Sequence, residues 1–202
     1  MYKRFACCKI SLAADREMNT SILLVSIWAK NYFAAKHADR TGNNRLHLHS
    51  AAGILHDNFK LSNVDYGHIM DCTFLLEKDS KAFEKILRLA AFNVFANNRD
   101  DHSKNFSFLM DESGSWKFAP AYDLIFSYSG HGFHSTSIAG ESAYPTKKHL
   151  LALAKHFKIK DANTIIDEVR SVLTDWKKYA TSANVSKTSK TSIDKVIQQK
   201  LI

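Results

Sequence analysis

The sequence of 202 residues contains only two prolines and seven glycines, so few residues interrupt regular secondary structure. Pro120 and Pro145 both fall between periodic segments, which leaves long stretches free to form helices. None of the glycines belongs to a G-x-G-x-x-G or Walker sequence. The chain therefore has no recognisable glycine-rich loop for holding phosphates.

Cysteines and long apolar runs are also scarce. Cys7, Cys8 and Cys72 make an odd count without C-x-x-C spacing, which predicts a reduced, cytoplasmic protein. The apolar run Ser21–Ala29 is too short to cross a membrane, and two acidic residues and an arginine precede it. We expect a buried helix or strand there, with no signal peptide and no membrane association.

The formal net charge is +8 at pH 7, but basic and acidic residues are mixed along the whole chain. This pattern fits a solvated surface or a pocket for a polyanionic ligand such as ATP. No recognition motif accompanies the charge, so direct DNA binding is not predicted. The ten histidines include no H-E-x-x-H sequence, and we expect them to be ordinary surface or core residues rather than zinc ligands.

Apolar periodicity predicts a mainly α-helical protein with a small β-hairpin. The hairpin pairs Phe106–Met110 with Trp116–Phe118 across the turn DESGS. Ser127–Tyr144 is rich in glycine and serine and is expected to form a long, partly mobile loop. The expected helices are 51–59 after a Ser50 cap, 64–77 after an Asn63 cap, 81–98 after Ser80, Thr146–Phe157, Ala162–Ala180 after Asp161, and Ser192–Ile202.

Three polar residues around the hairpin follow the order used by protein kinases. Asp100 precedes Asn105 by five positions, the hairpin follows, and Asp123 comes directly after it. An ionised carboxylate such as Asp100 can accept the proton of an attacking hydroxyl. The oxygens of Asn105 and Asp123 are hard ligands suited to Mg²⁺. The pattern predicts a phosphotransferase, although a plain polar loop also contains Asp and Asn at such spacings.

Two basic residues lie inside the same segment. Lys104 is expected to point toward the transferring phosphoryl group, and His102 to contact phosphate or brace the loop. Ser135, Thr136 and Ser137 follow Asp123 where kinases place an activation segment, so they are either phosphorylation sites or part of a plain loop.

The segments FNVFANNRDDHSKNFSFL and WKFAPAYDL resemble the HipA family of bacterial toxin kinases. The resemblance implies a protein-kinase-like C-terminal lobe that uses ATP and Mg²⁺ to phosphorylate serine or threonine. By position, it makes Asp100 the catalytic base, assisted by Lys104, and makes Asn105 and Asp123 the metal ligands. His102, Tyr122 and Asp123 would line the nucleotide site. The altered hinge Lys36-His37-Ala38 would face the adenine through its backbone.

The resemblance also implies partners and a division of the chain. Residues 36–185 correspond to the kinase lobe, residues 1–35 to an altered N-terminal segment, and residues 186–202 to a basic tail ending in a helix. Several proteins of the family it resembles are toxins that phosphorylate an aminoacyl-tRNA synthetase and are restrained by an antitoxin, so the resemblance implies such a substrate and such a partner. The family's phosphate loop and strand lysine have no counterpart here. The alternatives are therefore an enzyme completed by a separate N-lobe polypeptide, or a non-catalytic module that binds an antitoxin or another protein.

Overall fold

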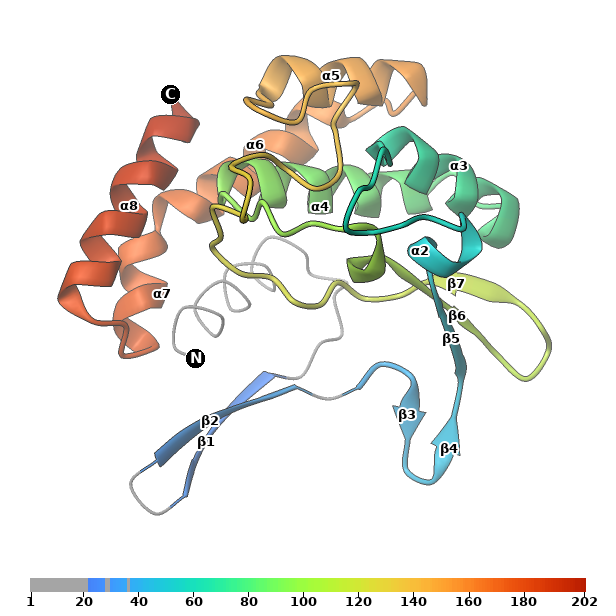
Figure 1. The fold of residues 1–202 in the computed structure, drawn as a ribbon, viewed down its shortest axis with the longest axis horizontal. Helices are drawn as coiled ribbons and strands as arrows, with labels where there is room; N and C mark the ends of the chain where they lie inside the picture. Colours follow the sequence, from blue (N-terminus) through green and yellow to red (C-terminus); the bar gives the residue numbers. More distant parts are fainter. Residues whose placement is uncertain (1–21, 28–29, 36) are drawn as a thin grey trace.

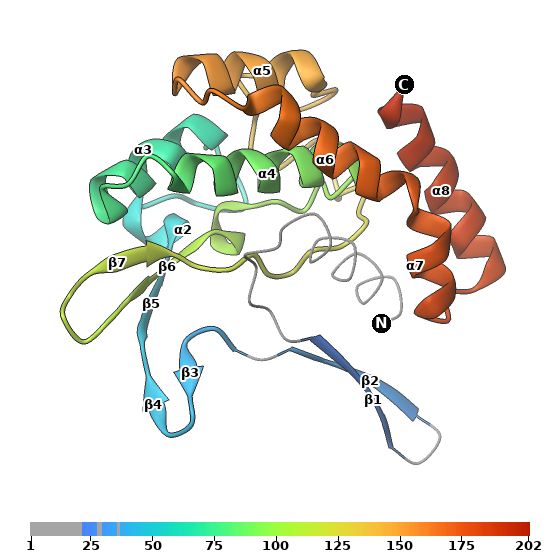
Figure 2. The same ribbon diagram turned by 180° about the vertical axis from the view of Figure 1, so that it is seen from behind.

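The computed structural model describes residues 22–27, 30–35 and 37–202 (Figure 1, Figure 2). All strand pairs are antiparallel and form two hairpins and one three-stranded sheet. The first hairpin shows that the apolar run near the N-terminus contains a strand. The strands are β1 Ile22–Ile27, β2 Lys30–Ala35, β3 Arg40–Thr41, β4 Asn44–Arg45, β5 His47–Ser50, β6 Ser107–Met110 and β7 Trp116–Phe118.

Helices make up most of the body, and the long helix α4 lies at its centre. Eleven of its fourteen residues are buried, because α3, α5, α6 and α8 pack around it. A helix that is apolar on nearly every side is typical of a protein core. The helices are α2 Ala51–Ile54, α3 Tyr66–Glu77, α4 Ala82–Phe95, the 3-10 turn η1 Ser103–Asn105, α5 Lys147–His156, α6 Ala162–Thr174, α7 Trp176–Ser182 and α8 Lys187–Leu201.

The sheet β5-β6-β7 lies on one side of this helical body and carries the chain out of the loop that follows α4 (Figure 1). Strand β6 is central, pairing with β5 from Ser50↔Ser107 onward and with β7 from Phe108↔Phe118 onward. Phe106 and Phe108 are buried at the entry to β6. A rigid helix therefore leads into the loop at residues 96–106, and a packed strand leads out of it.

The N-terminus of α3 is fixed by the side chain of Asp65. One carboxylate oxygen accepts a hydrogen bond from the Gly67 amide at 2.8 Å, as an N-cap does. The other oxygen accepts from the Ser137 hydroxyl at 2.7 Å and the Gly140 amide at 2.9 Å. Asp65 therefore ties α3 to a segment more than seventy residues further along the chain.

Several expectations about the helices need correction. Asp65, not Asn63, caps α3, because its side chain reaches the first-turn amides. The expected helix Ala162–Ala180 is two helices separated at Asp175, and α8 begins before the expected start. Asp161 stands at the N-cap position of α6 without a side-chain cap bond. The expected hairpin, the Ser50 cap and the central helix are confirmed.

The segment between Ser127 and Tyr144 is not the open loop that its composition suggested. His134, Thr136 and Ile138 are buried, at 3%, 0% and 0% exposure. Their neighbours Ser135 and Ser137 donate their backbone amides to the carbonyls of Arg99, after α4, and of Val64, before α3. The glycines and serines therefore mark turns of a packed connection. None of the helices in the described part of the chain has the length and apolar character needed to cross a membrane.

Substitutions at Asp65 test how strongly α3 and the distant segment depend on one carboxylate. Asp65→Ala removes the cap and both distant bonds, and we expect a loss of about 2 kcal/mol in the free energy of unfolding. Asp65→Asn retains a cap oxygen for Gly67 but places an NH₂ group against the donors of Ser137 and Gly140. It is expected to lose about half as much. Thermal unfolding measures both variants, and an Asp65→Asn variant as stable as the wild type would show that the distant bonds contribute nothing.

Candidate active site

The chain leaves α4 through a tight turn that contains two consecutive asparagines, Asn97 and Asn98. Asn97 adopts a left-handed conformation with φ of 55°, which Asn tolerates better than most residues. The Asn98 side chain donates to Asn93 Oδ1 at 2.9 Å, and its amide donates to the Asn93 carbonyl at 2.9 Å. Both residues are buried. The start of the candidate catalytic loop is thus bonded back to the central helix.

Residues that follow the hairpin return beside this turn. Ser127 donates its amide to the Asn97 carbonyl at 3.0 Å and accepts from the Arg99 amide at 3.3 Å. The Asn97 side chain also donates to the Ser127 carbonyl at 3.1 Å. The chain on the far side of Asp123 is therefore paired with the chain just before Asp100.

A second contact fixes the near side of Asp123. The Tyr122 hydroxyl donates to the Lys104 carbonyl and lies 2.6 Å from the Ser107 hydroxyl, which donates to it in turn. Burial raises the pKa of Tyr122 above its ordinary value, and the charge of Asp123 adds to this rise. Asp123 has a φ of 51°, another left-handed position that Asp tolerates. It is therefore bracketed by two anchors, one on each side of the Asp100–Asn105 segment.

Within that segment, the proposed base is accessible while its backbone is held. The Asp100 side chain is 42% exposed, and the His102 ring nitrogen Nε2 lies 3.9 Å from its Oδ1. Asn105 donates its Nδ2 to the Asp100 carbonyl at 2.8 Å. Because the amide nitrogen is engaged in this bond, the amide oxygen is the atom of Asn105 left to act as a ligand.

His102 and Lys104 both contact the connection between α2 and α3. The Lys104 ammonium lies 3.6 Å from the centroid of the Phe59 ring, a cation–π contact. His102 packs edge-on against the same ring. Ser103 between them donates to Asp57. Phe59 and Asp57 were not singled out from the sequence, which placed them in an expected helix over residues 51–59, whereas α2 ends at Ile54.

The expected hinge residues are placed only in part. Lys36 lies outside the described residues. His37 and Ala38 are exposed, and the recorded ion pair of His37 is with Asp39 at 3.4 Å. Their role toward an adenine stays a prediction.

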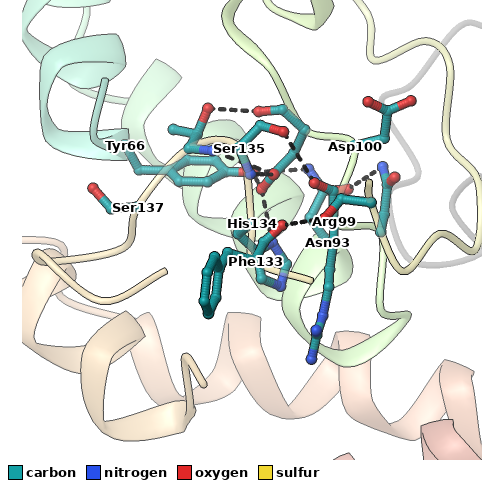
Figure 3. A network of polar contacts seen from close by, with 12 residues as sticks. Tyr66, Asn93, Arg99, Asp100, Phe133, His134, Ser135 and Ser137 are labelled. Carbon is teal, nitrogen blue, oxygen red and sulfur yellow. Dashed lines mark hydrogen bonds and ion pairs between the residues drawn. The ribbon is translucent and has the colours of Figure 1, made fainter. Parts of the chain in front are cut away.

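Sequence reasoning missed the most buried charged residue of the loop. Asp101 is 1% exposed and accepts hydrogen bonds from Tyr66, His134, and the Ser135 and Thr136 amides. Figure 3 shows these groups converging while Asp100 points away from them. A second Asp directly after Asp100 was the available signal, but adjacent acidic residues in a loop usually both face solvent.

The ligand chemistry around Asp123 fits Mg²⁺ rather than a closed transition-metal site. No group of three or more His, Cys, Asp or Glu side chains able to hold a metal occurs among the residues described by the structure. Mg²⁺ is commonly held by one or two carboxylates together with substrate phosphates and water. One Asp and one Asn amide oxygen satisfy that requirement.

Comparison with known proteins identifies the family of this chain. The family described as HipA-like C-terminal domain matches residues 4–176. The chain belongs to the HipA family. A protein of Sinorhizobium fredii (strain NBRC 101917 / NGR234) named as a candidate kinase, Y4mE, is 51% identical over 41 residues, which cover 20% of this chain and 10% of that protein.

HipA from Shewanella oneidensis MR-1, solved with HipB and its operator DNA, has the same fold. The superposition gives a TM-score of 0.73 at 15% identity and covers 98% of this chain and 53% of HipA. The chain thus spans about half the length of that relative. The expected family and the expected fold, a mainly helical kinase-like lobe, are both confirmed.

A cation of the C-terminal helix lies close to the catalytic loop of this HipA-like domain. Burial, together with the nearby charge of Arg99, lowers the pKa of Lys200 in α8 to about 8. The Arg99 guanidinium donates to the Gly132 carbonyl. α8 therefore places a second positive charge beside the residue that precedes Asp100.

The depressed pKa of Lys200 predicts a pH dependence of stability. Between about pH 8 and pH 10.5 the unfolded chain binds more protons at this lysine than the folded chain, so its contribution to the free energy of unfolding rises with pH. Below pH 8 the whole cost of the buried ammonium is present. Lys200→Met should therefore stabilise the protein at pH 7 by about 1–2 kcal/mol, and by less at pH 9.5.

The matched control is Lys195→Met, an exposed lysine of the same helix. Thermal unfolding at both pH values measures the two variants. If Lys200→Met and Lys195→Met shift the melting temperature equally at both pH values, Lys200 carries no such cost.

Proposed function

We propose that this HipA-like domain is the Mg-ATP-dependent phosphotransferase lobe of a serine/threonine kinase. Asp100 acts as the base that accepts the proton of the substrate hydroxyl. Asn105 and Asp123 are the Mg²⁺ ligands. Tyr122, His102 and Lys104 belong to the nucleotide side of the site.

One observation carries the proposal: Asp123 is bracketed by contacts to both ends of the Asp100–Asn105 segment. Tyr122 bonds to the Lys104 carbonyl at one end, and Ser127 pairs with Asn97 and Arg99 at the other. A loop of merely polar character has no need of these two anchors. Phosphoryl transfer does need them, since it depends chiefly on positioning and on charge stabilisation.

Each of the three proposed residues has the chemistry its role requires. Asp100 is exposed enough to meet a substrate hydroxyl, and among the described residues its ion-pair partner is the His102 ring at 3.9 Å rather than a lysine or arginine. The side-chain nitrogen of Asn105 is used in the bond to the Asp100 carbonyl, which leaves the side-chain oxygen to act as the ligand. When bound, Mg²⁺ would neutralise charge on the phosphates. Lys104, resting on the Phe59 ring, holds a positive charge at the exposed face of the same loop.

The parts of a kinase that grip the ATP phosphates have no sequence counterpart in these residues. We propose that a phosphate loop and a strand lysine act with this lobe from another segment or another polypeptide. The HipA structure from Shewanella contains HipB. By analogy, an antitoxin-like protein is the proposed partner, and an aminoacyl-tRNA synthetase is the proposed class of substrate.

Thermal unfolding with Mg-ATP tests the metal–nucleotide site directly. Ligand at about 100 times its dissociation constant stabilises the native state by roughly 2.7 kcal/mol, which for a chain of this size means about 5–10 °C. The wild-type chain should show this shift, and Asp123→Asn should lose it. Asn tolerates the left-handed backbone at position 123, so this variant is expected to fold.

Two further variants sharpen the test. Glu112→Gln removes an exposed acidic charge from the β6–β7 turn and should keep the full shift. Asp100→Asn should also keep it, because the base is not a metal ligand, while losing phosphoryl transfer. A wild-type chain with no Mg-ATP shift, or an Asp123→Asn variant with an undiminished one, would contradict the proposed site. The first result would instead favour the non-catalytic binding module.

A further inference from the structure

The residue directly after the proposed base is a fully buried carboxylate. Tyr66 donates its hydroxyl to Asp101 Oδ2 at 3.2 Å, and His134 Nδ1 lies 3.0 Å from the same oxygen (Figure 3). The amides of Ser135 and Thr136 donate to Oδ1 at 2.9 Å and 3.4 Å. Both oxygens therefore accept from donors in α3 and in the segment 134–136.

His134 lies beside this carboxylate and is equally buried. The side chains of His134 and Asp101 are both 0% exposed. An ionised carboxylate only accepts hydrogen bonds, so His134 carries a proton on Nδ1. Its Nε2 has no hydrogen-bond partner among the described residues. Among the described residues, the imidazole ring of His134 is thus held by hydrogen bonding through Nδ1 only, to Asp101.

The segment 134–136 also holds the backbone on each side of Asp100. Thr136 donates its hydroxyl to the Asp101 carbonyl at 2.5 Å. Ser135 donates its amide and its hydroxyl to the Arg99 carbonyl at 3.2 Å and 3.1 Å. Asn105 holds the carbonyl of Asp100 itself. Three consecutive carbonyls are fixed, while the Asp100 side chain stays exposed.

The network continues into the helical core. Asn93 in α4 donates to the Tyr66 hydroxyl at 2.8 Å, and Asn98 donates to Asn93 at 2.9 Å. Asn93 is the one polar residue among the buried residues of α4. The carboxylate of Asp101 is thereby connected to the central helix on one side and to the segment 134–136 on the other.

We propose that Asp101, His134 and Thr136 are positioning residues, which fix the backbone of Asp100 and couple its placement to the segment 134–136. This inference rests on the proposed function, in which Asp100 is the base. A catalytic group that must meet a substrate hydroxyl gains from being held before the substrate arrives, because small misplacements of reacting groups slow the reaction strongly.

Asp101→Asn is the obvious test, but it places an NH₂ group against buried donors and is liable to unfold the domain. Thr136→Val is the better variant, since it keeps the volume of a fully buried side chain and removes only the bond to the Asp101 carbonyl. Thr136→Ser restores the hydroxyl. Asp65→Asn is the matched control, because it releases Ser137 and Gly140 of the same connection without touching the catalytic loop.

Backbone hydrogen exchange of the full chain is the primary measurement, and it needs no activity. Thr136→Val should speed exchange of the Arg99 and Asn105 amides by about fivefold, the effect of losing one buried hydrogen bond. Thr136→Ser should restore the wild-type rates, and Asp65→Asn should leave these two amides unchanged. Unchanged exchange in Thr136→Val, or equal acceleration by Asp65→Asn, would overturn the inference whether or not the chain binds nucleotide.

Phosphate release from Mg-ATP, analysed as kcat and KM separately, is the second measurement. Thr136→Val should lower kcat about tenfold with KM unchanged, because the base is misplaced while the metal ligands are not. Faster exchange with an unchanged kcat would overturn the positioning role. If the wild type shows no Mg-ATP shift while the exchange pattern appears, the coupling of the two segments is supported and the proposed function fails.

Discussion

A carboxylate withdrawn from water must be surrounded by hydrogen-bond donors, and Asp101 imposes this requirement on the chain around it. The donors that reach its two oxygens lie outside the candidate catalytic loop. They come from Tyr66 at the start of α3 and from residues 134–136. Burial of one charge thus forces a connection rich in glycine and serine to cross the loop and to pack there. Burial and the charge of Asp101 also raise the pKa of Tyr66 well above its ordinary value.

The exposed residues of the candidate site depend on this buried framework. α4 supplies a rigid platform, the asparagines at its end turn the chain, and Ser127 and Tyr122 bind the returning segment at two points. The Asp100 side chain can stay partly exposed in a fixed position, and the backbone at Asp123 is fixed as well, because residues on both sides of each are hydrogen-bonded. Functional side chains on loops are usually positioned by a scaffold in this way. Here the scaffold is polar close to the site and apolar only further inside.

The sequence was informative wherever a local pattern decides the structure. Helical spacing predicted α4, strand alternation and the DESGS turn predicted the β6–β7 hairpin, and the order Asp100, Asn105, Asp123 predicted a kinase-like lobe. The sequence was not informative where contacts between residues far apart in the chain decide the local structure. The cap of α3 is chosen by Asp65 bonding to Ser137 and Gly140, which lie far along the chain. β5 joins the sheet through pairing with β6, and the short run HLHS carries little strand signal on its own. Asp101 was indistinguishable from its exposed neighbour until its partners were in place.

The contacts also separate two tasks that a kinase must perform. The hydrogen bonds described above for the backbone around Asp100 and Asp123 lie within residues 65–137, so this stretch of the chain positions the proposed base and the proposed metal ligand. Gripping the phosphates is a different task, done in kinases by a glycine-rich loop and a strand lysine. A lobe that positions the proposed base and metal ligand can remain folded in this arrangement without the parts that bind the phosphates. Phosphoryl transfer would then depend on joining the two, and control of that union would control activity without any change at the base.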